Sequence, residues 1–210
     1  MISLLQDNNQ IKLSLQFQIY NTSTSHFNLD KLKLAIISQL SRVYNGSFGK
    51  YNLKIICNVE IIKHKIGISP RKILIQIVDE INGNNPAEAD LGGLRIKLNK
   101  NIIDNIISEV NIRTIPHELG HLFGWNHPHA NALFQSINPN ASELEKLLTE
   151  VERCCNLMSQ TWYAQKANVL LENAMCITEN QVELLVQNFK NDVLNKNYHL
   201  KHFLFWKHLY

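Results

Sequence analysis

The stretch "RTIPHELGHLFGWNHPH", residues 113–129, places four of the chain's nine histidines beside one glutamate. His117 and His121 are four residues apart, so on a helix they project from one face with Cβ atoms about 6 Å apart. That separation lets both imidazoles reach one zinc ion at about 2.0–2.1 Å. The stretch therefore predicts a helix that carries two ligands of one metal ion.

The residues around this histidine pair complete a longer pattern. Gly124 is predicted to end the helix and to permit a sharp change of direction, after which His127 can supply a third nitrogen. A lone HExxH motif recurs by chance, and its histidines are then surface or hydrogen-bonded core residues. Here the glycine and the third histidine fall where the HExxHxxGxxH pattern has them. His129 is an alternative third ligand, but its spacing does not fit that pattern.

The pattern also predicts a hydrolytic reaction. Three neutral nitrogens leave a zinc ion with its double charge, which lowers the pKa of a bound water towards about 7. Glu118 points aside from the ligands but can reach that water. It can take the proton and later pass it to a leaving amine, while the metal polarises the carbonyl. The predicted ligands are His117, His121 and His127, with Glu118 as general base and acid.

The composition of the whole chain is that of a globular protein. With 210 residues, 45% hydrophobic and 19% charged, the chain suits one domain, or one domain in two lobes. A net charge of +3 without a Lys/Arg block or a phosphate-binding loop argues against nucleic acid. No apolar run is long enough for a transmembrane helix. The N-terminal "MISLLQDNNQ" lacks signal-peptide features, which leaves open a removed signal, another export route or no export.

Periodicity predicts a mixed sheet with a backing helix in the first half of the chain. Residues 11–20 alternate apolar and polar side chains, as a half-buried strand does. Asn28 can cap a helix whose apolar stripe ends at Asn45-Gly46. Further strands are expected at 53–64, 72–80 and 94–99, with turn chemistry throughout 81–93.

Helices are expected in the second half. A short amphipathic helix at 101–110 precedes the histidine helix, which should begin at Thr114 as its cap because Pro116 fits only the first turn. Capping-box pairs start two further helices, Ser142 with Glu145 at 142–153 and Thr178 with Gln181 at 178–194.

The segment "HELGHLFGWNH" resembles the long zinc signature of the metzincin metallopeptidases. Metzincins also carry a methionine turn beneath the metal, and "CCNLMSQ" supplies Met158 about thirty residues downstream. A methionine by itself is more often core packing, but its place after a complete zinc signature favours the turn. Within the metzincins, the chain most resembles the pappalysins, because of Arg113-Thr114 ahead of the first histidine, Asn156 before Met158, and Cys176 before a T-x-x-Q helix start.

The cysteines near this turn suggest a disulfide. Cys154, Cys155 and Cys176 are close enough in sequence for one bridge, which would imply an oxidising compartment. The resemblance implies that Cys154 or Cys155 pairs with Cys176, with Cys155 favoured. Such a loop of about twenty residues is worth about 3 kcal/mol in the chain-entropy model. A secreted or otherwise extracytoplasmic location is therefore expected.

Three features depart from the metzincin pattern or lie outside it. Several metzincins have a tyrosine two residues after the methionine, where this chain has Gln160, so Tyr163 is a candidate transition-state stabiliser, with packing as the alternative. Segment 79–90 is acidic enough to suggest Ca²⁺, which some relatives bind, although a solvated turn fits its spacing better. The basic, aromatic segment 198–210 is expected to pack on the protein, with its histidines as non-ligands, namely His199, His202 and His208.

The resemblance implies an α+β fold of the metzincin-type zincin class. A twisted mixed β-sheet with a backing helix and the active-site helix would form an upper lobe at about 1–126. A smaller irregular C-terminal lobe at about 127–210 would end in a helix, and 1–210 would be a single catalytic domain. Substrate would add a strand to an antiparallel edge strand, for which 91–98 contains the candidates.

The predicted function is a monomeric zinc endopeptidase with one catalytic Zn²⁺ ion and a protein or peptide substrate. One alternative is a zinc-binding pseudo-peptidase that acts as a binding module, against which the retained Glu118 argues. The other is a peptidase toxin or effector, for which the missing signal peptide is the only support.

Overall fold

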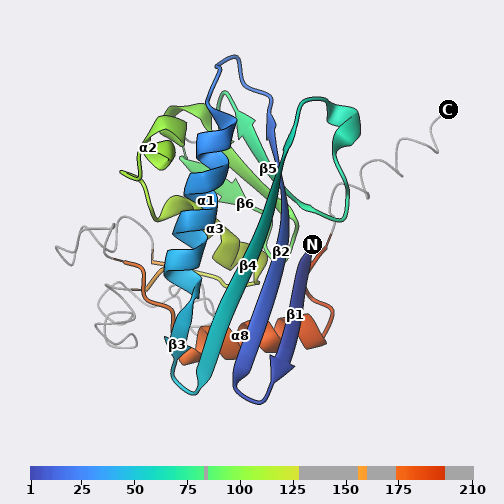
Figure 1. The fold of residues 1–210 in the computed structure, drawn as a ribbon, viewed down its shortest axis with the longest axis vertical. Helices are drawn as coiled ribbons and strands as arrows, with labels where there is room; N and C mark the ends of the chain where they lie inside the picture. The colour runs from blue at the N-terminus through green and yellow to red at the C-terminus, as the bar shows by residue number, and fades with distance from the viewer. Residues whose placement is uncertain (83–84, 128–155, 160–173, 197–210) are drawn as a thin grey trace, which may run out of the picture.

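The computed structural model describes residues 1–82, 85–127, 156–159 and 174–196. Within these residues the fold is α+β, with two helices packed against one face of a mixed sheet, a third short helix beside the first of them, and a fourth across the end of the sheet (Figure 1). None of the helices in this part of the chain is long and apolar enough to cross a membrane.

The described sheet has seven strands, and it contains both parallel and antiparallel pairs, which confirms the prediction of a mixed sheet. They are β1 (Ile2–Asp7), β2 (Gln10–Asn21), β3 (Gly46–Phe48), β4 (Tyr51–Ile62), β5 (Ile73–Val78), β6 (Ala87–Ala89) and β7 (Arg95–Asn99). Their order is β3-β4-β2-β5-β7-β6, with β1 beside β2. The pairs β2–β4, β2–β5 and β5–β7 are parallel, and the other pairs are antiparallel. Strand β6 is therefore an antiparallel edge.

Alternation along the strands places one apolar row of each strand in the core. In β2 the buried row is Ile11, Leu13, Leu15, Phe17 and Ile19. The register sets Phe17 beside Ile73 and Ile75 beside Ile96, so the rows of neighbouring strands lie in line. Because a shift of one residue would expose every one of these side chains, the core fixes the register.

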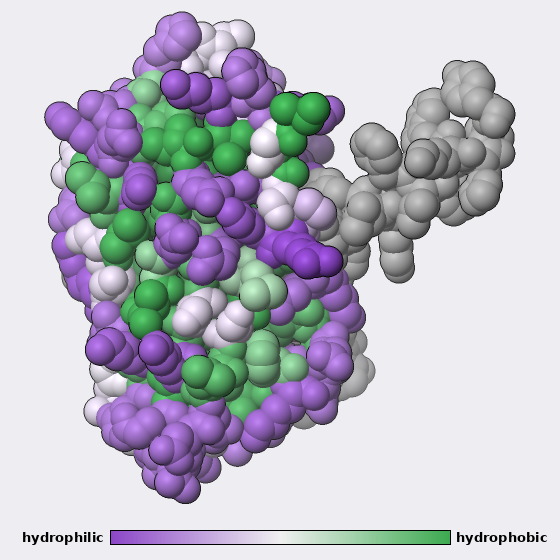
Figure 2. Space-filling view, turned by 45° about the vertical axis from the view of Figure 1, so that its right-hand side comes forward, coloured by the Kyte–Doolittle hydropathy of each residue, from purple (hydrophilic) through white to green (hydrophobic). Residues whose placement is uncertain are grey.

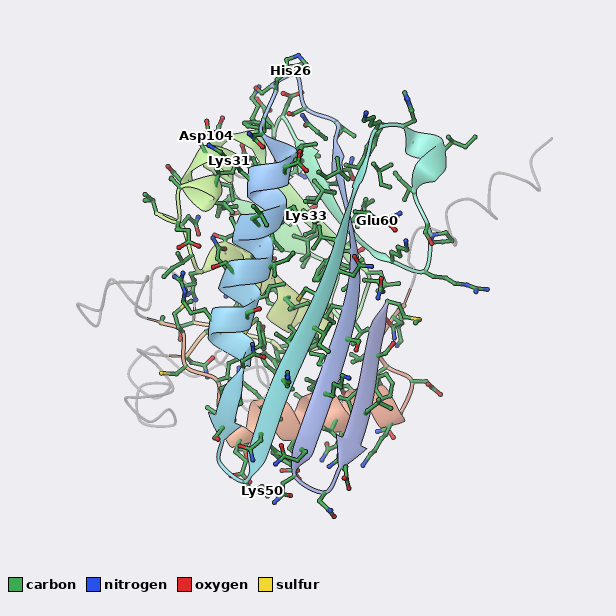
Figure 3. All side chains as sticks on the ribbon, in the orientation of Figure 1. His26, Lys31, Lys33, Lys50, Glu60 and Asp104 are labelled. Carbon is green, nitrogen blue, oxygen red and sulfur yellow. The ribbon has the colours of Figure 1, made fainter. Side chains whose placement is uncertain are left out.

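The helices cover this buried row. They are α1 (Leu29–Tyr44), α2 (Ile103–Ile107), α3 (Thr114–Leu122) and α8 (Glu179–Lys190). The Asn28 side chain accepts from the Lys31 backbone N–H at 3.0 Å, as the predicted cap of α1 should. Helix α8 crosses the end of the sheet where β3 and β4 turn (Figure 1), and there Lys50 Nζ lies 3.5 Å from Glu179 Oε1 (Figure 3).

The outer face of the sheet mixes apolar and polar side chains. Ile56 on β4 is exposed, and on the same strand Glu60 pairs with Lys72 at 2.7 Å (Figure 3). The side of the molecule in Figure 2 accordingly shows apolar areas interleaved with hydrophilic ones. This face is half-polar, whereas the helix-covered face is apolar.

Several boundaries differ from the prediction. Strands β1, β3 and β6 were not expected, because short or polar segments become strands only by pairing with a neighbour. The prediction that 91–98 holds the edge strand was wrong, since Arg95–Asn99 is the inner strand β7 and β6 is the edge. Helix α2 is shorter than 101–110, and α8 ends at Lys190 before 194. The predicted helix 142–153 lies outside the described residues.

Candidate metal centre

Helix α3 begins one residue earlier than predicted, because Arg113 and not Thr114 occupies the cap position. Thr114 is its first helical residue, and the Asn111 side chain accepts from the Thr114 N–H at 3.1 Å. The side chain of Asn111, and not that of Thr114, therefore accepts from a free backbone N–H at the start of the helix. Pro116 lies in the first turn as predicted, where no backbone N–H is needed. Its carbonyl accepts from the Tyr44 hydroxyl at 2.8 Å, which fixes α3 against α1.

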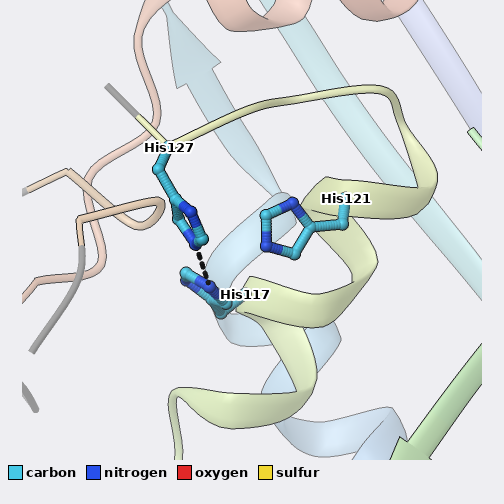
Figure 4. A group of neighbouring side chains, drawn as sticks. All are labelled: His117, His121 and His127. Atoms are coloured by element: carbon cyan, nitrogen blue, oxygen red, sulfur yellow. Dashed lines mark hydrogen bonds between the residues drawn. The ribbon is translucent and has the colours of Figure 1, made fainter. Parts of the chain in front are cut away.

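The fold brings the three predicted ligands together. Their ligand atoms all lie within 4.8 Å of one another (Figure 4). The ring centroids of His117 and His121 are 5.0 Å apart, and His127 lies 5.3 Å from the first and 4.7 Å from the second. Among the described residues this is the one group with metal-ligand geometry.

A turn after α3 delivers His127 to the other two histidines. Gly124 has φ of 82°, in the left-handed region that suits glycine. Its N–H donates to the His121 carbonyl at 2.9 Å, and the Asn188 side chain donates to the Phe123 carbonyl at 2.9 Å. The helix therefore ends at the predicted glycine, and α8 supports the turn.

Two backbone carbonyls fix which nitrogens face the centre. His117 Nδ1 lies 2.8 Å from the Leu157 carbonyl, and His121 Nδ1 lies 2.8 Å from the Trp125 carbonyl. Because a carbonyl only accepts, each Nδ1 carries the proton in the neutral ring. Each Nε2 is then left with a lone pair, and this is the arrangement that metal-bound histidines show.

The spacing of one pair of nitrogens fits a tetrahedral ion. His117 Nε2 and His127 Nε2 are 3.3 Å apart. Two nitrogens at zinc distance and at the tetrahedral angle would be about 3.3–3.4 Å apart. The residues present therefore suit a zinc ion in donor type and in number, and this one pair also has the spacing that a zinc ion requires.

The neutral form of the histidines is favoured by their surroundings. Burial lowers the pKa of His117 well below its usual value, and the charge of Arg113 lowers this pKa further. Burial also lowers the pKa of His121, against a smaller opposing effect of its bond to Trp125. Since only a neutral imidazole can bind a metal ion, both shifts favour binding.

Glu118 is buried in α3 between the two histidine ligands. It is 6% exposed. Burial raises the pKa of its carboxyl to about 8, while Arg113 opposes this rise and Glu88 adds to it. Without a metal the carboxyl therefore holds its proton near neutral pH, whereas a neighbouring doubly charged cation would favour the carboxylate.

Met158 packs directly beneath α3. Its side chain is fully buried, and a Cβ atom at Gly120 would overlap its sulfur and lie 3.0 Å from Trp125 Cε3. Gly120 therefore lets the histidine helix approach the methionine closely. This role was missed, although the glycine stands inside the "HELGH" motif.

Two residues hold the Met158 segment in place. The Met158 N–H donates to Asn156 Oδ1 at 2.8 Å, and the side-chain amides of Asn156 and Gln181 exchange hydrogen bonds of 3.1 and 3.2 Å. Gln181 also forms the predicted capping box with Thr178. The start of α8 thus connects to the segment under the histidines.

Arg113 joins three segments of the chain. Its Nη2 donates to the Leu157 carbonyl at 2.6 Å and to the Ser159 carbonyl, and its Nε donates to the Ala174 carbonyl at 3.1 Å. Burial lowers the pKa of its guanidinium to about 10, which leaves it charged at neutral pH. The sequence marked this residue only through family resemblance.

The edge of the sheet approaches the end of α3. The Gly92 N–H, in the loop between β6 and β7, donates to the His121 carbonyl at 2.9 Å. On this hairpin Glu88 pairs with Lys97, and Asp90 pairs with Arg95 at 3.0 Å.

Three of the four acidic residues in segment 79–90 are engaged with cations. Asp79 pairs with Lys100 at 2.8 Å, and Glu88 and Asp90 have the partners given above. These three carboxylates bind separate cationic side chains and do not converge on one point, which gives the calcium prediction no support.

Other predicted residues lie outside the described part of the chain. These are His129, Cys154, Cys155, Gln160, Tyr163, His199, His202 and His208. Cys176 is exposed, and its backbone carbonyl accepts from the Leu157 N–H at 2.8 Å. The disulfide and the role of Tyr163 stay predictions.

Comparisons with known proteins assign no family. No family model and no curated protein matches the chain. Similar solved structures include an archaemetzincin from Methanopyrus kandleri, with 13% identity, a TM-score of 0.47 and coverage of 84% of this chain and 96% of that one. An archaemetzincin from Archaeoglobus fulgidus in complex with malonate has 13% identity, a TM-score of 0.43 and coverage of 81% and 99%. None of these comparisons points to the pappalysins. At these identities and TM-scores, the comparisons support no function for the three histidines.

Proposed function

We propose that the protein is a zinc-dependent peptidase whose metal is held by His117, His121 and His127. The observation that carries the proposal is the convergence of three imidazoles, two of them with Nδ1 bound to a backbone carbonyl and Nε2 facing the centre. The three rings are half-buried, and His117 and His121 each present an Nε2 lone pair to the same point, where a cation would satisfy both.

The chain's own residues supply the remaining parts of a hydrolytic site. A bound zinc ion would lower the pKa of a water and polarise a carbonyl. Glu118 would accept the proton of that water on its carboxylate and return it to the leaving amine. Its buried position on α3 suits a group that must change protonation during a reaction.

The edge strand β6 offers a place for an extended peptide. Among the described residues it pairs with β7 on one side only, and the hairpin that contains it contacts the end of α3 through Gly92 and His121. A peptide substrate would add a strand at this edge through backbone hydrogen bonds. The metzincin-type assignment rests on the zinc signature and on the position of Met158 beneath it.

The test pairs metal content with cleavage of a mixed peptide library, for the wild type, Glu118→Gln and His121→Ala. We expect one zinc per chain in the wild type and in Glu118→Gln, cleavage by the wild type alone, and loss of zinc in His121→Ala. Because glutamine has nearly the shape of glutamate, the first variant separates proton transfer from metal binding.

Two results would contradict the proposal. Zinc in both the wild type and Glu118→Gln, without cleavage by either, would indicate a zinc-binding module instead of an enzyme. A wild type that binds no zinc would remove the basis of the proposal.

A further inference from the structure

Arg113 connects the start of the histidine helix to the segment beneath it. Its guanidinium donates to the carbonyls of Leu157, Ser159 and Ala174. The five N–H groups of a guanidinium lie in a fixed planar fork. One rigid group therefore sets the positions of three carbonyl oxygens that belong to other parts of the chain.

One of these carbonyls also contacts a proposed metal ligand. The Leu157 oxygen accepts from Arg113 Nη2 at 2.6 Å and from His117 Nδ1 at 2.8 Å. A carbonyl oxygen has two lone pairs and can accept both bonds. The position of the Leu157 oxygen thus depends on Arg113, and the proton on His117 Nδ1 depends on that oxygen.

A donor that would favour the other tautomer of the His117 ring lies nearby. Arg113 Nη2 lies 3.4 Å from His117 Nδ1, and a guanidinium can only donate. If the Leu157 carbonyl moved away, Nδ1 would lose its acceptor and could accept from a nearby donor such as Nη2 or water, so the ring proton would move to Nε2. That tautomer could not offer Nε2 to a metal ion.

We propose that Arg113 is a positioning residue, which keeps the Leu157 carbonyl on His117 Nδ1 and so presents His117 Nε2 to the metal. The role of His117 as a metal ligand rests on the proposed function, but the effect of Arg113 on the ring proton of His117 does not. Lysine at this position would keep the positive charge and lose the planar fork, so it could not hold three carbonyls in the same geometry.

The test compares Arg113→Lys with the wild type and with Arg42→Lys. Arg42 pairs with Glu109 on the exposed surface at 2.9 Å, so its variant is the matched control. The tautomer of His117 is read from ring ¹⁵N chemical shifts of the metal-free protein, and the zinc Kd is measured by competition with a chelator. If Arg113→Lys does not fold, Arg113→Gln is used instead.

We expect the Nδ1–H tautomer in the wild type and in the control, and a mixed or Nε2–H ring in the Arg113 variant. Its zinc Kd should rise by about 10–100-fold, as when partners of metal-bound histidines are removed. An unchanged tautomer with an unchanged Kd would overturn the inference, even if the variant is less stable. If the wild type binds no zinc, the proposed function fails, and the tautomer alone decides the role of Arg113.

Discussion

At the scale of single residues, Gly120 is expected to tolerate no larger side chain. In most helices Gly→Ala stabilises by about 0.5–1 kcal/mol. Here the new methyl group would overlap Met158 and press on Trp125, and overpacking costs about 1–3 kcal/mol. Gly120→Ala should therefore lower the free energy of unfolding of the metal-free protein, measured by urea denaturation.

The control for this prediction is the same substitution in a Met158→Ala background. If the Met158 sulfur is the obstacle, Gly120→Ala should become neutral or stabilising there, because the two changes are coupled. An equal cost in both backgrounds would place the clash elsewhere.

The buried carboxyl of Glu118 predicts a pH dependence of stability. Its pKa of about 8 in the folded, metal-free protein lies above the 4.5 of an exposed glutamate. The folded state therefore holds the proton more tightly than the unfolded chain does. Stability from this group is fully present below pH 4.5 and is lost progressively up to about pH 8, with a total on the order of 5 kcal/mol.

This dependence is measured as a difference between the wild type and Glu118→Gln in the presence of a chelator. The neutral amide cannot titrate, so the wild type should lose stability relative to the variant as the pH rises from 5 to 8. His117 and His121 are present in both proteins, and their titration contributes to both curves. Parallel curves would mean that the carboxyl is ionised and solvated in the folded state.

At the scale of elements, the start of α8 should influence the segment beneath the histidines. Thr178→Ala removes one arm of the capping box and should cost about 1 kcal/mol. Gln181→Ala removes the other arm and the two bonds to Asn156, so it should cost about 2 kcal/mol. Only the second variant should speed hydrogen exchange at the Met158 N–H, which Asn156 accepts.

The matched control at this scale is Asn28→Ala, which removes the cap of α1. It should cost about 1 kcal/mol without changing exchange at Met158. Equal exchange in all three variants would show that the Met158 segment does not depend on α8.

At the scale of the whole molecule, Asn195 joins the two ends of the described fold. Its side chain accepts from the Ile2 N–H at 2.7 Å and donates to the Ile2 carbonyl at 2.9 Å. Its φ of 62° is in the left-handed region. Asn195→Gly should lose only the two hydrogen bonds, about 1–2 kcal/mol, whereas Asn195→Ala should lose about 1 kcal/mol more through backbone strain.

Urea denaturation of both variants checks the order of these costs. Hydrogen exchange at Ile2 should rise in both, because β1 loses the contact on its outer edge. If glycine costs as much as alanine, backbone strain is not part of the effect.

The candidate metal site and most of the elements around it follow from local patterns in the sequence. The ligand spacing from His117 to His127 needs only a helix followed by a glycine turn, and both are local properties. The cap at Asn28 and the capping box of Thr178 with Gln181 are also local, and the structure has them.

The contacts that hold this site in place arise between segments that are distant in the sequence. Strand β6 exists because β7 pairs with it, since Ala-Glu-Ala has little preference for a strand. The side chain that accepts from the backbone at the start of α3 belongs to Asn111 and not to Thr114. The bonds from Arg113 and His117 to the Leu157 carbonyl span 44 and 40 residues of chain. No local pattern encodes such contacts, because they depend on where distant segments meet after the core has formed.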